Sequence, residues 1–290
     1  MNIAILSRGK ELYSTQSLLN AAEAKNHTVS VIDPDFCNAL IEDHRTLIQY
    51  HDTMLTNFDA VIPRISVSNT YFGSSIVRHF EAMNVFCAVS SEGILNSRDK
   101  WVSFQIMAKA GIPLPKTTLS IPAYAEDFLM DFGKRPVIIK LLEGTHGEGV
   151  ILCESYQNAL ATMEALHSVG TKFIIQEYIA ESKGTDIRAI VVGDEVVAAM
   201  KRKAKDGEFR SNLHRGGSSE KIILSPEEKN IAIQAAKALN LGVCGVDMLP
   251  SENGVLVLEV NSTPGLEGIE KTTGIDVSRK IIQYLECNKR

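Results

Sequence analysis

The segment CGVDMLPSENGVLVLEVNSTPG, residues 244–265, predicts two short strands joined by a turn. Asp247 lies in the first strand, and Glu259 and Asn261 lie near the end of the second. Because side chains alternate between the two faces of a strand, Glu259 and Asn261 share one face, while the opposite face is apolar. The second strand therefore presents an acid and an amide side by side.

The pairing of these two strands depends on the turn between them. A two-residue turn at Asn253-Gly254 would pair Asp247 with Val260 and put the aspartate on the apolar face. A three-residue loop with Gly254 in the left-handed conformation pairs Asp247 with Glu259 instead. We expect the second register, which gathers oxygen donors of the kind that bind Mg²⁺ beside substrate phosphates. On this segment alone, a solvated hairpin with ordinary surface acids is an equal alternative.

Composition and charge exclude several classes of protein. The chain has 290 residues, and its 44% hydrophobic and 22% charged content are typical of a soluble globular protein. A formal net charge of -5 disfavours a general nucleic-acid binder, so we expect no direct nucleic-acid role. The five scattered cysteines form no CxxC pair, which indicates reduced thiols. No apolar run suits a signal peptide or a membrane span, so we expect a cytoplasmic protein without a membrane role.

Residues 1–95 alternate strand and helix patterns, which predicts a small α/β unit with a mostly parallel sheet. Ligands of such sheets bind beyond the carboxyl ends of the strands, where Arg8 and Arg64 follow two of the predicted strands. Either arginine is able to bind an anion, although an arginine in this position is more often a solvated surface residue. No G-x-G-x-x-G sequence follows the first strand, which disfavours a dinucleotide-binding fold.

The middle of the chain begins with a predicted helix at 97–110, capped by Ser97, and a connector with two prolines at 112–115. Two predicted strands, 136–140 and 150–153, flank the glycine-rich loop EGTHGEG. The loop lacks the Gly-Lys-Ser/Thr ending of a P-loop and opens no helix, so neither the Walker nor the Rossmann pattern fits. It is either a plain turn or a flexible hairpin tip whose amides fold over phosphates.

The second half of the chain contains a strong hairpin pattern, with strands at 186–192 and 195–201 around the turn Gly193-Asp194. The basic run that follows, residues 201–205, predicts a solvated or mobile loop. The next segment, RSNLHRGG at 210–217, also suits a lid that places positive charge over a reacting phosphate.

In this order, these features resemble the ATP-grasp carboxylate–amine ligases. The shared segments are Arg98-Asp99-Lys100, Lys140, EGTHGEG at 143–149, QEYI at 176–179, DIR at 186–188, GVD at 245–247 and LEVNSTPG at 258–265. The chain is most similar to the RimK family, whose activity is the addition of glutamate to a small-subunit ribosomal protein. The features behind this closer match are IAILSR at 3–8, VIPR at 61–64, RSNLHRGG at 210–217 and GLEGIEKTTGID at 265–276.

The resemblance covers nearly the whole chain, with two departures. Arg8-Gly9-Lys10 stands where an acidic residue is expected, and the chain is short after Leu285. Both departures concern recognition of the acceptor more than catalysis. The implied fold is α/β, an α+β ATP-grasp with ATP between two sheets. It divides into a small N-terminal parallel α/β domain at 1–95, a central lobe at 96–180 and a C-terminal lobe with the metal site at 181–290.

The resemblance also implies a nucleotide site. A lysine on a strand, such as Lys140, is held more rigidly than a surface lysine, whereas Lys100 in the first turn of a helix is normally just exposed. The implied ATP-binding residues are Lys100 and Lys140 at the phosphates, Gly144, Gly147 and Gly149 in the loop, Glu177, Tyr178 and Ile179 at the adenine, Asp186 at the ribose, and Arg210, Ser211 and Asn212 near the transferred phosphoryl group.

The implied reaction has two steps. A carboxylate of the acceptor attacks the γ-phosphate of ATP and gives an acyl phosphate and ADP, and the amine of glutamate then displaces phosphate. Asp247, Glu259 and Asn261 would hold one or two Mg²⁺ or Mn²⁺ ions that neutralise charge during phosphoryl transfer. Arg210 and Asn212 are the implied catalytic residues, because a preorganised donor stabilises the transferring group.

The implied partners are glutamate and the C-terminal tail of a protein, with a ribosomal protein as the expected acceptor. Related enzymes often form dimers or tetramers, so we expect a homo-oligomer by analogy. A first alternative is an ATP-grasp ligase that glutamylates a small molecule. A second is a catalytically silent nucleotide-binding module, although the metal donors and both phosphate lysines are all present.

Overall fold

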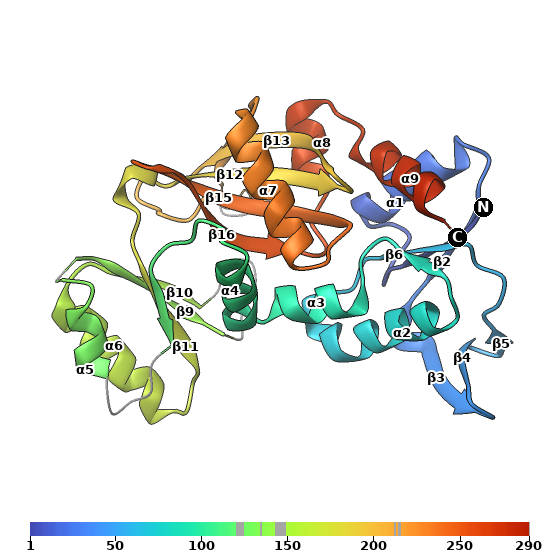
Figure 1. Ribbon diagram of the computed structural model, residues 1–290, viewed down its shortest axis with the longest axis horizontal. Coiled ribbons are helices and arrows are strands. Elements are labelled where there is room, and N and C mark those ends of the chain that lie inside the picture. The colour runs from blue at the N-terminus through green and yellow to red at the C-terminus, as the bar shows by residue number, and fades with distance from the viewer. Residues whose placement is uncertain (120–124, 134, 143–148, 212, 214–215, 290) are drawn as a thin grey trace.

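The computed structural model describes residues 1–119, 125–133, 135–142, 149–211, 213 and 216–289 (Figure 1). In this part of the chain the strands form one parallel sheet and three antiparallel sheets, with helices packed against them. This mixed architecture confirms the predicted α/β fold class. The described helices include none that is both long and apolar enough to cross a membrane.

The N-terminal sheet is parallel, as predicted, with strands in the order β2-β1-β6-β7. From Ile3 to Leu6 every residue of its central strand is buried, which explains the unbroken apolar run in the sequence. The elements are β1 (Asn2–Leu6), α1 (Tyr13–Glu23), β2 (Thr28–Ile32), the 3₁₀ helix η1 (Pro34–Phe36), β6 (Ala60–Pro63), the 3₁₀ helix η2 (Val67–Asn69), α2 (Thr70–Ala82) and β7 (Phe86–Cys87).

A small antiparallel sheet beside this unit is missing from the sequence prediction. Its strands are β3 (Cys37–Glu42), β4 (Arg45–Tyr50) and β5 (Thr53–Met54). The turn between β3 and β4 places Asp43 and His44 at φ of 48° and 64°. Such hairpin turns are usually marked by Asn-Gly or Asp-Gly, and neither pair occurs here. The sequence therefore lacks the signal by which this hairpin would be found.

The predicted helix at 97–110 corresponds to α4 (Lys100–Lys109), and a separate helix that was not predicted, α3 (Ser91–Arg98), precedes it. Asp99 separates them, because its carboxylate accepts hydrogen bonds from the backbone N–H groups of Trp101 and Val102 at 2.9 and 3.0 Å. Such a side chain caps the first turn of a new helix. The predicted cap at Ser97 is wrong. The break at Asp99 leaves Arg98 at the end of α3 and Lys100 at the start of α4.

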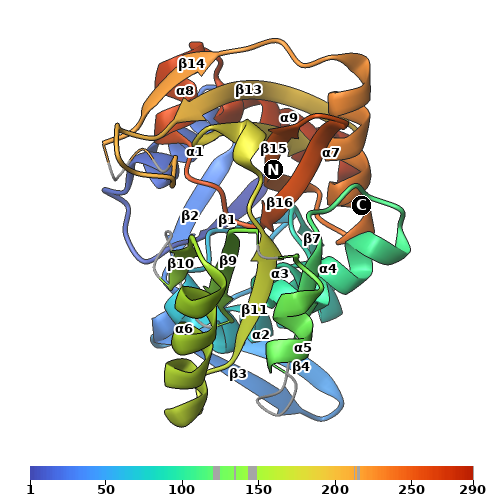
Figure 2. The same ribbon diagram turned by 90° about the vertical axis from the view of Figure 1, so that its left-hand side faces the viewer.

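The second sheet is antiparallel and lies in the order β10-β9-β11-β8. Figure 2 shows it below the five-stranded sheet, with α5 and α6 on its outer side. Val137, Ile139 and Phe173 pack with these helices, so Lys140, which alternates with Ile139, points to the opposite face. The elements are β8 (Thr117–Leu119), α5 (Ala125–Met130), β9 (Val137–Leu141), β10 (Val150–Cys153), α6 (Tyr156–Ser168) and β11 (Phe173–Glu177).

The third sheet is antiparallel and has the order β14-β13-β12-β15-β16. The helix α7 packs against one face of it, and its N-terminus has the predicted capping box between Ser225 and Glu228. The elements are the 3₁₀ helix η4 (Ala180–Ser182), β12 (Thr185–Val192), β13 (Glu195–Lys203), β14 (Ser218–Lys221), α7 (Pro226–Ala238), β15 (Val243–Ser251), β16 (Gly254–Asn261), α8 (Glu267–Thr273) and α9 (Val277–Asn288).

The register between β15 and β16 pairs Asp247 with Glu259, as expected, but by a different route. The turn has two residues, because Ser251 already pairs with Gly254, whose φ is 104°. The register then shifts between Asp247 and Met248, where a β-bulge leaves Leu258 without an opposite residue. The predicted three-residue loop is therefore wrong, and the bulge is what sets Glu259 beside Asp247.

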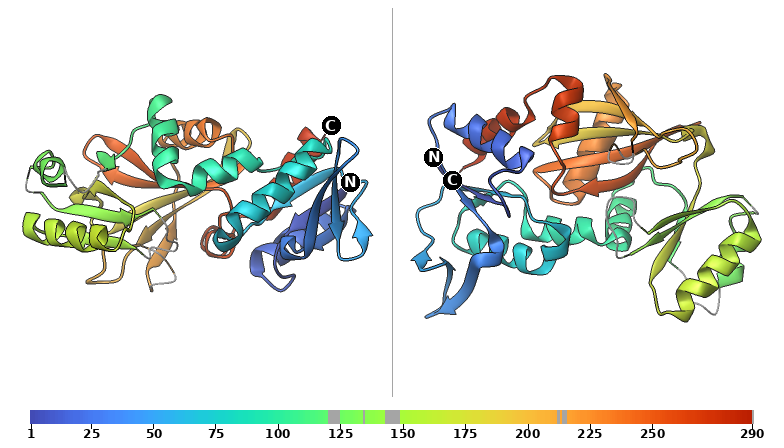
Figure 3. Two further views of the ribbon diagram at one scale, coloured as in Figure 1. Left: turned by 90° about the horizontal axis from the view of Figure 1, so that it is seen from below. Right: turned by 180° about the vertical axis from the view of Figure 1, so that it is seen from behind.

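Buried apolar residues form two clusters in the described part of the chain. One runs through both the parallel sheet and the five-stranded sheet, and the other belongs to the four-stranded sheet with α5 and α6. At the far end of the first cluster, α9 packs against α1, so the two termini lie at one end of the molecule (Figure 3). Glu286 of α9 pairs there with Lys25 and His27. The domain boundaries at 95 and 180 stay predictions.

We predict that Gly93→Ala destabilises the fold, because α3 packs tightly against the turn after α7. A Cβ at position 93 would lie 2.8 Å from the carbonyl oxygen of Asn240 and 2.9 Å from that of Leu239. Backbone atoms in this turn have little room to move, so the free energy of unfolding should fall by ~1–3 kcal/mol. Urea denaturation measures the change.

The matched control is Gly265→Ala, where the added Cβ would meet no atom within 4 Å. This variant should change the unfolding free energy by less than ~1 kcal/mol. Equal stability of the two variants would contradict the tight packing of α3 against the turn.

Candidate active site

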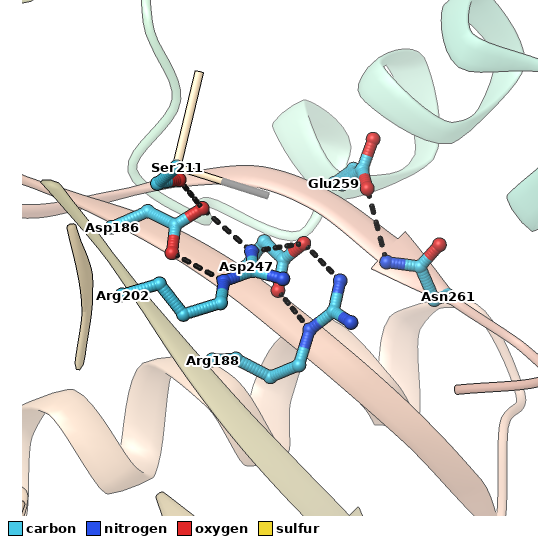
Figure 4. Close-up of polar contacts among 7 residues, drawn as sticks. All are labelled: Asp186, Arg188, Arg202, Ser211, Asp247, Glu259 and Asn261. Carbon is cyan, nitrogen blue, oxygen red and sulfur yellow. Dashed lines mark hydrogen bonds and ion pairs between the residues drawn. The ribbon is translucent and has the colours of Figure 1, made fainter. Parts of the chain in front are cut away.

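One face of the five-stranded sheet is lined with charged side chains from four neighbouring strands. Arg188 pairs across the sheet with Asp247, and Asp247 pairs with Glu259. Asp186 of β12 pairs with Arg202 of β13, the other neighbour of β12. Because directly paired residues point to the same face, all five side chains lie together (Figure 4).

Asp247 is held by two arginines. Arg188 donates to it from Nε to Oδ1 at 2.7 Å and from Nη2 to Oδ2 at 2.5 Å. Arg202 Nη2 lies 3.0 Å from the same Oδ2. Burial by itself would raise the pKa of Asp247, but the two guanidinium groups outweigh it and hold the pKa at about 2. The carboxylate is therefore fully ionised at neutral pH although its residue is only 2% exposed.

Arg202 also binds Asp186, so it is shared by two buried carboxylates. Its Nε and Nη2 donate to Asp186 Oδ1 and Oδ2 at 2.7 and 2.6 Å. Ser211 Oγ donates to Asp186 Oδ2 at 2.6 Å. Burial would lower the pKa of Arg202, but the carboxylates of Asp247 and Asp186 raise it above its ordinary value. In this structure Asp186 thus anchors Arg202 and Ser211, and its contact with a ribose stays a prediction.

Glu259 and Asn261 lie together at the end of β16. Asn261 Nδ2 donates to Glu259 Oε1 at 3.1 Å, which turns the amide oxygen away from the acid (Figure 4). Glu259 is exposed, whereas Asp247 is buried beside it. The residues described contain no cluster of three or more His, Cys, Asp or Glu side chains arranged for a metal. The candidate site is instead two carboxylates and one amide, a donor set that fits a hard cation.

Lys140 and Lys100 face this site from the second sheet and from α4. Burial lowers the pKa of Lys140 to about 8, with the charge of Glu259 opposing the shift, the charge of Lys100 adding to it and that of Asp247 opposing it. Burial also lowers the pKa of Lys100, again opposed by Glu259. Lys100 Nζ donates to the carbonyl oxygen of Leu142 at 3.1 Å. Both predicted lysines are therefore near enough to Glu259 for its charge to act on their pKa.

The glycine loop follows β9, as predicted, but Gly144 and Gly147 lie outside the described residues. Gly149 has a φ of 69°, and its carbonyl oxygen accepts from the N–H of Leu141 at 2.8 Å. A side chain at position 149 would clash with Leu141, whose Cγ is 2.8 Å from the site of a Cβ. Glycine is thus required where this loop rejoins the sheet.

The predicted adenine-binding residues follow one another at the end of β11. Glu177 Oε1 accepts from the backbone N–H of Lys116 at 2.6 Å. The N–H of Tyr178 donates to the carbonyl oxygen of Pro136 at 3.3 Å, and Ile179 is 7% exposed. The three residues are therefore fixed in the segment that leads from the second sheet to the third.

Among the predicted catalytic residues, Arg210 is turned toward Glu208. Its Nε and Nη2 donate to Glu208 Oε1 and Oε2 at 2.9 and 2.8 Å, and these bonds lower the pKa of Glu208 to about 2. Ser211 is buried and bound to Asp186, as described above. Asn212 lies outside the described residues. The structure thus anchors the start of this segment to the charged face through Ser211 and orients Arg210 within the segment.

The most buried cation of the site was not predicted from the sequence. The basic run 201–205 was predicted to be a solvated loop, which is wrong for Arg202 and Lys203, since these residues continue β13. Arg202 is 3% exposed and faces Asp186 and Asp247, while Lys203 is exposed. The strand alternation of the preceding hairpin was the available signal, but the run of basic residues concealed it. Arg188 was noted only as part of a family motif.

We predict that Arg202→Met lowers the free energy of unfolding by ~3–5 kcal/mol, because it leaves two buried carboxylates without their shared cation. The control is Lys201→Met on the same strand. The Lys201 side chain is 43% exposed and lies 4.0 Å from an exposed Glu220, so its loss should cost less than ~1 kcal/mol. Thermal or urea unfolding of both variants measures the difference, and equal stability would contradict the shared role of Arg202.

Comparison with known proteins identifies the family of this chain. Residues 97–285 match the RimK-like ATP-grasp domain, and residues 1–94 match the RimK pre-ATP-grasp domain. A protein of Picosynechococcus sp. named probable alpha-L-glutamate ligase is 53% identical over 289 residues, which cover 99% of this chain and 96% of that protein.

Two solved structures show the same fold at low identity. The ATP-grasp ligase PsnB, complexed with a phosphomimetic variant of its minimal precursor, Mg and ADP, has a TM-score of 0.76 at 18% identity, with 99% of this chain and 97% of that chain covered. The macrocyclase MdnC from Microcystis aeruginosa, bound with precursor peptide MdnA, has a TM-score of 0.76 at 16% identity, with coverage of 99% and 100%. Both domain matches and the close relative show that this chain belongs to the RimK-like ATP-grasp family of ATP-dependent ligases.

Proposed function

We propose that this enzyme joins L-glutamate to the C-terminal carboxylate of a peptide or protein tail and converts ATP to ADP and phosphate. The observation that supports it most directly is that Lys140 is buried in the second sheet, near enough to Lys100, Glu259 and Asp247 for their charges to act on its pKa. Two cations opposite two acids suit a nucleotide whose phosphates contact the lysines and whose metal contacts the acids. The name of the Picosynechococcus relative supports glutamate as the amino acid.

The reaction is a condensation through an activated acid. An oxygen of the acceptor carboxylate bonds to the γ-phosphorus of ATP, the bond from that phosphorus to the β,γ-bridging oxygen breaks, and ADP leaves. The amine of glutamate then attacks the acyl carbon, loses a proton and expels phosphate, which leaves an amide. Lys100 and Lys140 bind the phosphates of ATP, and Arg210 and Asn212 act on the transferred phosphoryl group.

The donor set of the site fits the ion that such a reaction uses. Asp247, Glu259 and the amide oxygen of Asn261 would hold Mg²⁺ or Mn²⁺, which supplies charge neutralisation at the phosphates when bound. Arg188 and Arg202 keep Asp247 ionised, since their charges lower its pKa. Asp247 is therefore already negatively charged at neutral pH and would release no proton when a metal ion binds.

A peptide tail is the acceptor that we favour. PsnB and MdnC share the fold over nearly their whole length and are complexed with a minimal precursor and a precursor peptide. A small-subunit ribosomal protein is the specific acceptor that the RimK family match favours. A small-molecule acceptor is the outcome that would replace it in the test below.

The test is the intact mass of candidate acceptors after incubation with enzyme, ATP, Mg²⁺ and glutamate. A ribosomal protein or its C-terminal peptide should gain the mass of one or more glutamyl residues, with equimolar ADP. Glu259→Gln should lower the rate at least ~10²-fold with the fold intact, because one charge of the cation site is lost. Glu252→Gln, an exposed acid at the turn of the same hairpin, should leave the rate unchanged.

Three results would contradict the proposal or its choice of acceptor. ADP release and ligation by Glu259→Gln at the wild-type rate and ordinary Mg²⁺ would remove the assigned site. Binding of ATP without ADP release, with glutamate and any peptide or small acid, would indicate a non-catalytic nucleotide-binding protein. Glutamylation of small acids but of no peptide would reassign the acceptor.

We predict that affinity for MgATP falls as pH rises above about 8, because the pKa of Lys140 in the free protein is about 8. A polyanion binds the protonated lysine, so affinity is full below this pKa and falls toward ~10-fold per pH unit above it. Calorimetric titration at pH 7, 8 and 9 measures the trend. Lys140→Met should bind more weakly at pH 7 and lose this slope, and a slope equal to that of the wild type would contradict the assignment.

A further inference from the structure

Two arginines meet where the parallel sheet touches the segment after β16, and the proposed reaction leaves both without a role. Arg64 directly follows β6, and its Nη2 donates to the carbonyl oxygen of Pro264 at 2.8 Å. Arg98 is the last residue of α3, and its Nη2 donates to the carbonyl oxygen of Ile65 at 2.8 Å and to Thr263 Oγ1 at 2.7 Å. Both guanidinium groups therefore lie against the segment 262–265.

The partners of these arginines are neutral oxygens. Within the part of the chain that the structure describes, neither Arg64 nor Arg98 lies within 4.0 Å of a carboxylate. This contrasts with Arg188 and Arg202, whose charges are matched by Asp247 and Asp186. A guanidinium has five N–H donors, and the contacts of Arg64 involve Nη2 alone.

The two charges are close enough to repel each other. Burial, with the neighbouring charge of Arg98, lowers the pKa of Arg64 to about 10, and burial lowers the pKa of Arg98 to about 10. Both groups stay charged at neutral pH. Keeping two cations together in a partly desolvated place is unfavourable unless an anion joins them. Both residues are half-buried.

The position of the pair puts it next to the proposed reaction centre. Thr263 is four residues from Glu259, a distance of at most ~14 Å even for a fully extended chain. Arg98 is two residues from Lys100, across the Asp99 break between α3 and α4. Arg64 lies at the carboxyl end of a parallel strand, where ligands of such sheets bind. A substrate held by the arginines is thus within reach of the phosphates.

We propose that Arg64 and Arg98 bind a carboxylate of the glutamate substrate that does not react, and so orient its amine toward the acyl phosphate. This inference rests on the proposed function. Planar guanidinium groups bind carboxylates through paired charge-assisted hydrogen bonds, which makes arginine suited to this recognition.

The carboxylates of glutamate fit this role better than the carboxylate of the acceptor. The acceptor carboxylate loses its charge when it becomes an acyl phosphate, so a pair of cations that stabilises it before reaction would slow the first step. Glutamate keeps both of its carboxylates through the whole reaction. A cation pair therefore stabilises bound glutamate without opposing any step.

The experiment measures the KM for glutamate in Arg64→Lys and Arg98→Lys, at saturating MgATP and acceptor. Lysine keeps the charge but loses the paired geometry, so each change should raise this KM by ~10–100-fold. The dissociation constant for MgADP should stay within ~2-fold of the wild type, and so should the thermal midpoint. Arg45→Lys, at an exposed arginine of β4, is the matched control and should leave every parameter unchanged.

A comparison on the wild-type enzyme needs no variant. Glutamine and isoglutamine each lack one of the two carboxylates of glutamate, and the enzyme should reject at least one of them by ~10²-fold or more, because a guanidinium is left unpaired. In the two lysine variants this preference should shrink.

Three results would overturn the inference. The first is an unchanged KM for glutamate in both variants, and the second is a loss of MgADP affinity as large as the loss for glutamate. The third is equal use of glutamate, glutamine and isoglutamine by the wild type. In each case the wild type still ligates glutamate, so the proposed function stands. Failure of the wild type to ligate glutamate to any acceptor would instead overturn the proposed function, and this inference with it.

Discussion

The rest of the site depends on one buried guanidinium, that of Arg202, placed between Asp186 and Asp247. Two carboxylates in one dry face of a sheet would repel each other and draw protons, and the shared cation removes both problems. It also ties β13 to β12 and β15, and through Asp186 it holds Ser211 at the start of the segment with Arg210. One buried cation thereby sets the charge of the proposed metal donor Asp247 and the position of the segment that begins at Ser211.

Lys140, which we propose to bind the nucleotide, has surroundings that differ from those of Arg202. Lys140 is buried, and the charges of Glu259 and Asp247 only partly oppose the effect of burial, which lowers its pKa to about 8. Such a lysine is held in place without being neutralised, and a phosphate that replaces the lost hydration is favoured. Arg202, which is paired with two buried carboxylates, thus differs from Lys140, which we propose to bind a phosphate.

Much of this could be predicted from the sequence, and the failures have physical causes. Strand alternation was enough to place Glu259 and Asn261 on one face, and pairing with Asp247 followed from expecting the face to be polar. No local sequence signal marks the bulge at Leu258. The predicted pairing of Asp247 with Glu259 was therefore right, although the predicted turn was wrong. Arg202 was missed because a basic run resembles a solvated loop. Its burial depends on carboxylates of other strands, Asp186 and Asp247, which the local sequence does not reveal. Tertiary contacts, not local preference, decided these positions.

The two apolar clusters have a mechanical consequence. The parallel sheet and the five-stranded sheet share one core, and the C-terminal helix α9 packs against the N-terminal helix α1. The four-stranded sheet has its own core with α5 and α6. Hinge bending that leaves both cores intact must therefore swing this smaller body, which contains Lys140, against a rigid frame that contains Asp247. Such a motion would change the separation between Lys140 and Asp247, the two sides of the proposed nucleotide site.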